Sequence, residues 1–286
     1  MFYTVPEDNM AERGKIAVLM TCHNRVETTL RCLEALFANR ACELDVWLVD
    51  DASSDGTGRI VKERYPQVDI IAGTGSLFWG RGMRLAWKTA LESGREYAWF
   101  LWLNDDVVLK PSAIEGLLED FAACGGGRSV VVGACSADES ERRSSYGATD
   151  EKDIRYEPDG RAPRRAAGWF NGNVVLVPAA TCREIGIISG DYSHSRADYD
   201  YAERLKRAGI PFYASSRFAG RCADTAADSW LPGPFMARVR LLVRPGNCNI
   251  RDLWLYMRRY RGFFRALVST AHLVAVVLFG RKSANA

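Results

Sequence analysis

Short apolar runs alternate with longer segments of helical spacing between Ile16 and Cys124. The runs have the length of buried strands, and the segments between them repeat apolar residues every three or four positions. We expect strands at 16–21, 45–49, 68–71 and 97–103. We expect helices at 27–39, 56–64, 81–93 and 111–124. This alternation predicts a doubly wound, Rossmann-like α/β fold with a mainly parallel sheet and right-handed crossovers.

The pattern is less regular further along the chain. Apolar runs at 129–135 and 174–177 indicate two more strands, separated by a polar stretch rich in turn residues. A helix expected at 199–208 ends before Gly209, a residue suited to the left-handed backbone that often follows a helix.

Composition and charge narrow the class of protein. Of the 286 residues 48% are hydrophobic and 26% charged, which is typical of a globular protein. The net charge of +3 is too small to indicate a nucleic-acid partner. Eight cysteines without a CxxC pair favour a reducing compartment. Residues 1–15 lack the apolar run of a secretory signal, so we expect the catalytic part to be cytoplasmic.

Polar residues follow each of the first four expected strands. Because ligands of such sheets bind at the carboxyl ends of the strands, we expect these residues to line one crevice. They are Thr21, Asn24 and Arg25, then Asp50 and Asp51, then 73–75, and finally Asn104, Asp105 and Asp106. A dinucleotide site would need glycines directly after the first strand, and their absence there argues against a nicotinamide enzyme.

The acidic residues in this set have more than one interpretation. Asp50 is either a hydrogen-bond acceptor for a nucleotide base or ribose, or an ordinary turn residue, and Asp55 is best explained as a helix cap. Asp105 and Asp106 end a very apolar strand, where carboxylates need a cation or solvent. Such oxygen ligands suit Mg²⁺ or Mn²⁺ completed by substrate phosphates, with a solvated loop as the alternative.

The later helix carries another acidic pair. Asp198 stands at its start, where it is either an N-cap or a general base. Asp200 and Arg204 are four residues apart and are expected to form a structural ion pair. Trp79 and Trp169 are placed either to stack on a sugar or base, or to pack in the core.

The ordered set of motifs resembles glycosyltransferase family 2, inverting transferases with the GT-A fold. The matching pieces are TCHNR, VDDASSDGT, LNDDV, FNGNVVLVP and ADYDYAERLKRAG, and the resemblance covers roughly residues 15–220. The segment GSLFWGRGMRLAWKTA also resembles members of the family that build bacterial surface polysaccharides.

The resemblance implies a donor site and a divalent metal, Mg²⁺ or Mn²⁺. Asp50 would contact the base, Asp106 would hold the metal bridging the donor diphosphate, and Asp105 would assist. The residues assigned to the nucleotide sugar are Thr21, Asn24, Arg25, Asp50, Asp51, Gly75, Arg81 and Asp105. Many relatives have a further metal ligand near the position of Cys222 and Asp224.

The resemblance also implies a catalytic base and an acceptor side. Asp198 would be the base, although Ala197 stands where the family usually has Glu. A structural or acceptor-side role is expected for His194. The residues assigned to the acceptor side are Trp79, Trp169, Asn171, Gly172 and Asn173.

These roles predict a hexosyl- or deoxyhexosyltransferase. The donor would be a UDP- or dTDP-sugar, and the acceptor a hydroxyl of a glycan or lipid-linked molecule in cell-surface polysaccharide synthesis. The alternatives are a sugar nucleotidyltransferase on the same fold and a non-catalytic sugar-nucleotide-binding protein.

The end of the chain has a different character. From Arg238 to Lys282 there are ten basic residues and one acid. The apolar run at 266–280 is shorter than the roughly 20 residues of a spanning helix. We therefore expect a GT-A domain over 1–228 and a helical segment over 229–286 that lies on the inner face of the cell membrane, attracted by anionic lipids. A helix packed on the catalytic domain is the alternative.

Overall fold

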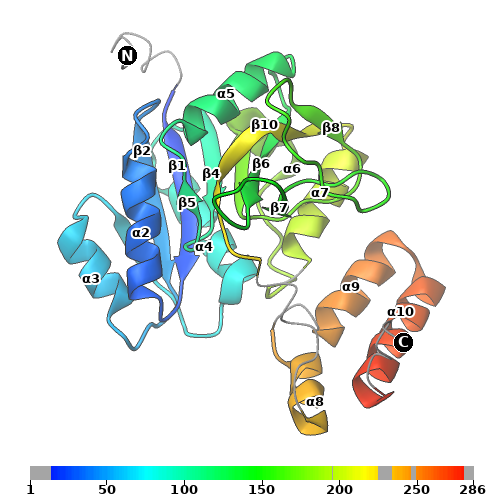
Figure 1. Cartoon of the computed structure of the whole chain (residues 1–286). Coiled ribbons are helices and arrows are strands. Elements are labelled where there is room, and N and C mark those ends of the chain that lie inside the picture. Colours follow the sequence, from blue (N-terminus) through cyan, green and yellow to red (C-terminus); the bar gives the residue numbers. More distant parts are fainter. Residues whose placement is uncertain (1–13, 195, 225–233, 246–248, 280–286) are drawn as a thin grey trace.

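One open sheet runs through the protein and carries helices on both faces (Figure 1). Its strands are β1 (Ile16–Cys22), β2 (Leu44–Asp50), β3 (Asp69–Ala72), β4 (Trp99–Leu103), β5 (Val108–Leu109), β6 (Val130–Ser136), β7 (Ser144–Tyr146), β8 (Arg164–Ala166), β9 (Val174–Pro178) and β10 (Phe212–Arg221). Their order is β3-β2-β1-β4-β9-β6-β10-β5, with β7 paired to β6 and β8 to β10. This structure, a computed structural model, describes residues 14–194, 196–224, 234–245 and 249–279.

The helices divide between the two faces because successive strand residues point to opposite sides. In β1, Ala17 and Leu19 pack in the same core cluster as residues of α4 (Phe78–Glu92), α6 (Ala179–Ile185) and α7 (Ala197–Arg207). Val18 and Met20 pack in the opposite cluster with α2 (Val26–Phe37), α3 (Thr57–Arg64) and α5 (Ala113–Ala123).

The first four strands are parallel, and their carboxyl ends lie together. β1 pairs with both β2 and β4, and β2 pairs with β3. In this register Cys22 is opposite Asp50, and Asp50 is opposite Ala72. The residues after these strands therefore share one edge of the sheet, as the sequence predicts. The predicted α/β fold class is confirmed, and the expected strands and helices in this part appear within about three residues of their predicted limits.

The second half of the sheet is mixed. β9 runs antiparallel to both β4 and β6, and β10 runs parallel to β6. The sequence did not predict β10, because its centre is Ser215, Ser216 and Arg217 instead of an apolar run. Ser215 and Ser216 are buried. Ser216 donates hydrogen bonds through its N–H and its hydroxyl to the carboxylate of Asp120, at 2.8 and 2.7 Å.

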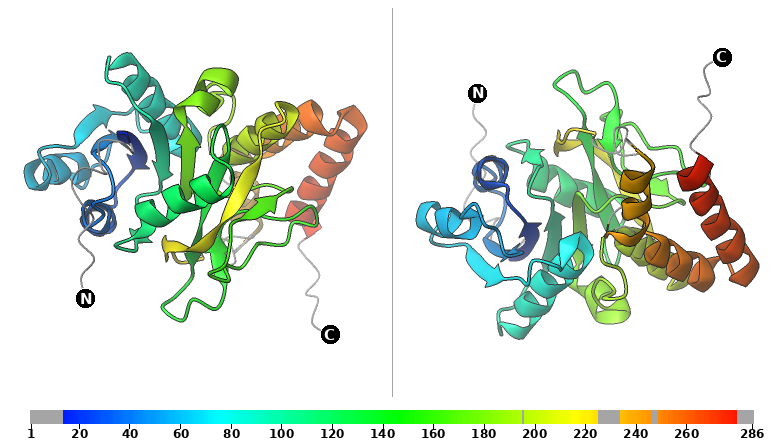
Figure 2. Two further views of the ribbon diagram at one scale, coloured as in Figure 1. Left: turned by 90° about the horizontal axis from the view of Figure 1, so that it is seen from above. Right: turned by 90° about the horizontal axis from the view of Figure 1, so that it is seen from below.

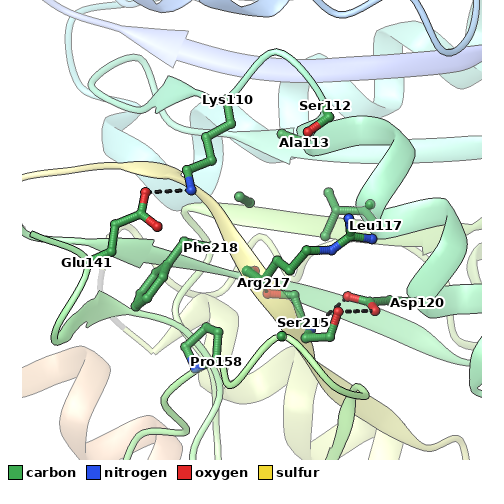
Figure 3. Close-up of a pocket in the computed structure, with 14 residues that line it drawn as sticks. Lys110, Ser112, Ala113, Leu117, Asp120, Glu141, Pro158, Ser215, Arg217 and Phe218 are labelled. Atoms are coloured by element: carbon green, nitrogen blue, oxygen red, sulfur yellow. Dashed lines mark hydrogen bonds and ion pairs between the residues drawn. The ribbon is translucent and has the colours of Figure 1, made fainter. Parts of the chain in front are cut away.

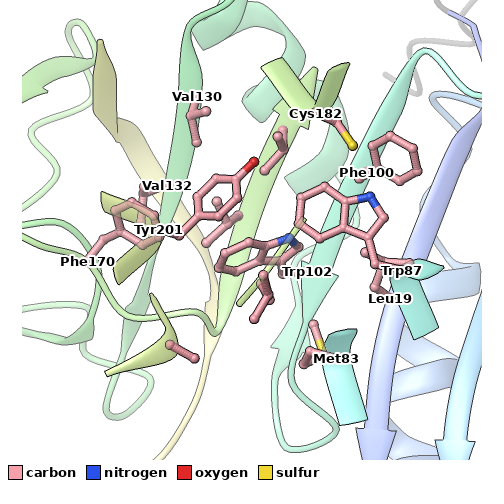
Figure 4. Packing of buried hydrophobic residues seen from close by; sticks show 14 of the residues in the cluster. Leu19, Met83, Trp87, Phe100, Trp102, Val130, Val132, Phe170, Cys182 and Tyr201 are labelled. Carbon is pink, nitrogen blue, oxygen red and sulfur yellow. The ribbon is translucent and has the colours of Figure 1, made fainter. Parts of the chain in front are cut away.

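An aromatic cluster fills the core on the side of α4 and α7 (Figure 4). Trp102 of β4 makes edge contacts with Trp87 and Tyr201, with ring centroids 5.7 and 5.0 Å apart. Phe170 packs on the other side of Trp102 at 6.1 Å. Trp102 lies two residues before Asn104, so this cluster anchors the end of β4 where the polar loop begins.

The C-terminal helices α8 (Phe235–Val243), α9 (Ile250–Tyr260) and α10 (Phe263–Phe279) gather at one end of the protein, with α10 on the outer side of α9 (Figures 1 and 2). α9 is bonded to α7 through Asp200, which is fully buried. Asp200 accepts hydrogen bonds from Arg204, Arg259 and the hydroxyl of Tyr260, at 3.0, 3.0 and 2.7 Å.

The expected pairing of Asp200 with Arg204 is thus confirmed, and α9 packs on the catalytic domain as the alternative interpretation expected. Among the described helices, none is long and apolar enough to cross a bilayer.

We expect Asp200→Asn to lower the free energy of unfolding by on the order of 3 kcal/mol, because Arg204 and Arg259 lose a buried counter-charge. Glu63→Gln is the matched control: it breaks an exposed pair with Arg59 and should leave stability within about 0.5 kcal/mol of the native chain. Urea denaturation measures both. Equal values for the two variants would contradict a stabilising role for the network around Asp200.

Candidate active site

Two adjacent carboxylates follow β4 at the carboxyl edge of the sheet. Asp105 is 6% exposed, and Asp106 is more accessible. One guanidinium nitrogen of Arg25 lies 3.2 Å from an oxygen of each. Burial raises the pKa of Asp105 to about 6; the charge of Arg25 opposes this rise and that of Asp106 adds to it. The structure therefore brings Arg25, Asp105 and Asp106 together, as predicted.

The second oxygen of Asp105 is buried and has no hydrogen-bond partner. A buried carboxylate oxygen without a donor is suited to a cation. Within the described part of the chain, no three His, Cys, Asp or Glu side chains form a metal cluster. The adjacent carboxylates of Asp105 and Asp106, with this unpaired oxygen, fit Mg²⁺ or Mn²⁺, which bind one or two carboxylates and take other ligands from substrate phosphates.

The region expected to supply a further metal ligand lies close by. The thiol of Cys222 is 3.4 Å from an oxygen of Asp106, and burial raises its pKa, so it is held as a thiol. Asp224 lies 3.9 Å from Arg155. Burial lowers the pKa of His194, while Asp252 raises it and Arg25 lowers it further, which favours a neutral imidazole.

The loops after β1 and β2 are joined to each other. Asn24 has a left-handed backbone, with φ of 52°, and its side-chain oxygen accepts from the N–H groups of Ser54 and Asp55 at 2.7 and 3.3 Å. The N–H of Arg25 donates to the hydroxyl of Thr57 at 3.2 Å. Thr21 packs against α4 at Gly82, where an added Cβ would collide with its side chain. Asn24 and Thr21 therefore shape the crevice.

All four carboxylate oxygens of Asp50 and Asp51 accept hydrogen bonds from backbone N–H groups. Asp50 accepts from Ser53 and Gly58, both at 3.0 Å. Asp51 is buried and accepts from three N–H groups in the loop that leads into α4, those of Gly75, Leu77 and Phe78, at 2.7, 2.9 and 3.0 Å. Asp51 thus positions the Gly75 loop. Donor contacts by these residues remain predictions.

Asp198 is not a helix cap. The N-cap position of α7 is Arg196, and Asp198 is the second residue of the helix. Its oxygens accept from the N–H groups of Tyr199 and Gly172, at 2.9 and 3.2 Å. Burial raises the pKa of Asp198 to about 6, although these N–H groups and the charge of Arg196 lower it. A carboxylate with this pKa is suited to accept a proton near neutral pH.

A short segment joins Asp198 to the loop after β4. Gly172 donates to Asp198, and the next residue, Asn173, accepts from the N–H of Asn104 at 3.0 Å. The indole of Trp79 donates to the side chain of Asn104 at 2.7 Å and lies where a Cβ on Gly172 would collide with it. Trp79, Gly172 and Asn173 therefore lie between Asp198 and Asp105.

The remaining predicted residues lie around this segment. Trp169 stacks on Tyr199 with ring centroids 4.5 Å apart and donates to Asp153 at 2.7 Å. Asn171 has a buried side-chain oxygen without a partner, which is available to a ligand. Arg81 is half-buried in the first turn of α4.

The sequence analysis missed Arg196 and two residues of α9, Tyr256 and Asp252. Arg196 lies over the rings of Tyr199 and Tyr256, at 4.9 and 5.8 Å from their centroids. Tyr256 belongs to α9, so only the folded chain brings it to α7. Asp252 of the same helix accepts from the N–H and hydroxyl of Ser193, at 3.1 and 2.9 Å, in the loop before α7. Tyr256 and Asp252 are far from Asp198 along the chain, so the local sequence gave no signal for them.

A separate cavity of about 320 Å³ lies between α5 and β10 (Figure 3). Lys110 pairs with Glu141 at this cavity, at 2.5 Å, and Asp120 bonds to Ser216. None of the predicted site residues lines it. The cavity is therefore distinct from the crevice at the ends of β1 to β4.

Comparison with known proteins agrees with this geometry. The family model of glycosyl transferase family 2 matches residues 17–183. The N-acetylglucosaminyl-diphospho-decaprenol L-rhamnosyltransferase of Mycobacterium tuberculosis is 26% identical over 196 residues, covering 58% of this chain and 62% of that protein. The chain thus spans less than two thirds of that relative's length. Chondroitin synthase of Escherichia coli is 28% identical over 109 residues, covering 37% of this chain and 15% of the synthase.

Two solved structures share the fold. The mannosyltransferase PcManGT from Pyrobaculum calidifontis, in complex with GDP-Man and Mn²⁺, has a TM-score of 0.56 at 15% identity, covering 94% of this chain and 76% of that one. S. aureus TarS 1–349 in complex with UDP-GlcNAc has a TM-score of 0.54 at 14% identity, covering 87% and 73%. The family match extends over more than half of the chain and confirms the prediction of a glycosyltransferase: this protein belongs to glycosyl transferase family 2.

Proposed function

We propose that the chain is an inverting glycosyltransferase that moves a sugar from a UDP- or dTDP-sugar to a hydroxyl of a lipid-linked glycan, in cell-surface polysaccharide synthesis. The observation that carries the proposal is the link from Asp198 through Gly172 and Asn173 to the loop of Asp105 and Asp106. Through this link the carboxylate of Asp198 and the carboxylate pair lie at one crevice, which supports a base acting beside a metal. The name of the mycobacterial relative, which includes a diphosphate-linked lipid, supports the acceptor class.

Asp198 is the general base in this proposal. It takes the proton of the acceptor hydroxyl as that oxygen attacks the sugar, and positioned proton transfer of this kind contributes about 10²–10⁴-fold. Gly172 and Tyr199 hold its two oxygens in place. Asn171 precedes Gly172, which donates to this carboxylate, and Trp169 stacks on Tyr199 of α7, so we assign both to the acceptor.

Asp106, with Asp105, holds the divalent ion in this proposal. When bound, Mg²⁺ or Mn²⁺ would stabilise the negative charge that develops on the departing diphosphate. Arg25 contacts both carboxylates and neutralises part of their charge before the donor binds. The PcManGT complex, whose title names Mn²⁺, supports a metal in a protein of this fold.

We expect nucleoside diphosphates or sugar nucleotides with Mn²⁺ to raise the melting temperature of the native chain, because a ligand that binds the folded state stabilises it. Asp106→Ala should lose the metal-dependent part of this rise. Glu63→Ala, on the exposed surface of α3, should keep it. A thermal-shift panel of uridine, deoxythymidine and guanosine nucleotides measures the effect. Absence of any response from the native chain would favour the non-catalytic alternative.

The rate of transfer should depend on the protonation of Asp198. Because its pKa is raised to about 6, kcat/KM should fall as the pH is lowered through 6 and reach a plateau above about pH 7. Asp198→Asn should reduce kcat at least about 10²-fold while leaving nucleotide binding intact. Initial rates across pH 5–8, with nucleotide binding measured over the same range, test this. Full activity of the Asn variant would rule out Asp198 as the base.

We propose further that the protein lies on the inner, cytoplasmic face of the membrane through its C-terminal helices. Phe264 and Val268 of α10 are 81% and 69% exposed, and Phe235 and Met236 of α8 are exposed as well. Arg265 lies beside the α10 pair and is also exposed. Exposed apolar side chains interleaved with arginine suit an interface that contains anionic lipid.

We expect the native chain to sediment with vesicles containing phosphatidylglycerol, and less so with neutral vesicles or at high salt. The double variant Phe264→Ser, Val268→Ser should lose most of this binding, since the two side chains share one face of α10. Ile154→Ser, which removes an exposed apolar side chain from the catalytic domain, is the control and should bind like the native chain. Binding by the double variant equal to that of the control would contradict the proposed surface.

A further inference from the structure

Arg196 has an unusual environment for an arginine next to a proposed catalytic base. Its Nε atom is buried without a hydrogen-bond partner, and no carboxylate of the described residues forms an ion pair with it. Its backbone is left-handed, with φ of 74°, which is costly for a residue other than glycine. Buried polar atoms are normally paired, so an unpaired arginine held in a strained position indicates a missing ligand.

Other arginines on the same side of the protein are paired. Arg204 and Arg259 bind Asp200, each at 3.0 Å, and Arg261 lies 2.7 Å from Glu203. Arg196 instead lies over the rings of Tyr199 and Tyr256. Contact with aromatic faces leaves the edges of a guanidinium free, and these edges carry the N–H groups that bind phosphate in a bidentate manner. Arg196 is therefore oriented by packing and is available to an anion.

The position of Arg196 lies between two parts of the proposed site. On one side, its charge acts on Asp198, two residues later, whose pKa it lowers. On the other side it contacts Tyr256 of α9, the helix that carries α10 on its outer side (Figure 2). In a sugar linked to a lipid by a diphosphate, the phosphates likewise lie between the reacting hydroxyl and the lipid. In the protein, Arg196 likewise lies between the proposed base, Asp198, and the helices proposed to face the membrane.

We propose that Arg196 binds a phosphate of the diphosphate that links the acceptor sugar to its lipid, with Tyr199 and Tyr256 holding the guanidinium in place. This inference rests on the proposed function. A charge-assisted bidentate contact of this kind selects acceptors that carry a diphosphate over neutral glycosides of the same sugar.

A second positive charge lies nearby. Arg155 and Arg196 both lower the pKa of Tyr199, which burial and Asp198 raise. Like Arg196, Arg155 has a buried Nε without a partner, although its Nη1 lies 3.9 Å from Asp224. The charges of two arginines therefore act at Tyr199, which favours an anionic group close to that ring.

The test measures binding of farnesyl diphosphate to the full chain in detergent, with UDP and Mn²⁺ saturating the donor site. We expect binding by the native chain, weakened about tenfold or more in Arg196→Gln and partly restored in Arg196→Lys. Farnesol, which lacks the diphosphate, should bind weakly and equally to all variants. Arg207→Gln is the matched control, because Arg207 also lies over a tyrosine ring, that of Tyr260, at the far end of α7.

Inorganic pyrophosphate separates a lipid-linked ligand from a free one. The proposal requires farnesyl diphosphate to bind more tightly than pyrophosphate. Equal binding of farnesyl diphosphate by the native chain and Arg196→Gln overturns it, as does no binding at all. Loss of nucleotide affinity in Arg196→Gln would instead assign the residue to the donor. Failure of the proposed function itself is distinguishable, because it would appear as an absent nucleotide response in the native chain.

Discussion

The hydrogen bond from the N–H of Asn104 to the carbonyl of Asn173 holds the two halves of the site together. It exists because β9 runs antiparallel to β4, so that the beginning of β9 lies beside the end of β4. The residue before Asn173 then binds Asp198, and the residues after Asn104 are the carboxylate pair. Each side is supported by packing: Trp79 bonds to Asn104 and lies against Gly172, while Trp102 anchors β4 in the aromatic core. The antiparallel pairing of β9 with β4 thus sets the distance between the proposed metal site and the proposed base.

The acidic residues of the crevice fall into two physical groups. Asp51 accepts three backbone N–H bonds and is satisfied, so its charge contributes to the shape of the loop. Asp105 and Asp198 are also buried but accept fewer hydrogen bonds than Asp51, and burial raises the pKa of each to about 6. A group whose charged form is disfavoured in the free protein gains most from a cation or a proton that a substrate supplies. We therefore assign chemistry to Asp105 and Asp198, whose charged forms are disfavoured by burial, and to Asp106 beside Asp105.

The C-terminal helices belong to the site as well as to the proposed membrane surface. Asp252 fixes the loop before α7 through Ser193, whose carbonyl accepts from the N–H of Gly80 at the start of α4. Asp200, which is fully buried, joins α7 to α9 by ion pairs with Arg204 and Arg259. A force or ligand that displaces α9 would therefore act on the helix that carries Asp198. These bonds give a physical route by which the proposed contact of α10 with lipid could be linked to the proposed binding of an acceptor.

The sequence by itself determined the first half of the fold and the composition of the crevice. The spacing of apolar residues along the chain locates the strands and helices. Because the carboxyl ends of parallel strands lie at one edge of a sheet, the same pattern also predicts that Arg25, Asp50 and Asp106 lie together. The tertiary structure decided what these local patterns do not contain. β10 was not predicted because its centre is polar: the buried Ser216 is hydrogen-bonded to Asp120, a partner distant in sequence. The same holds for Arg196 and Tyr256, which meet only because α9 folds back on α7. The local pattern of apolar and polar residues predicts which face of a helix or strand is buried. The pairing of polar groups far apart in the chain depends instead on how the helices and strands pack together.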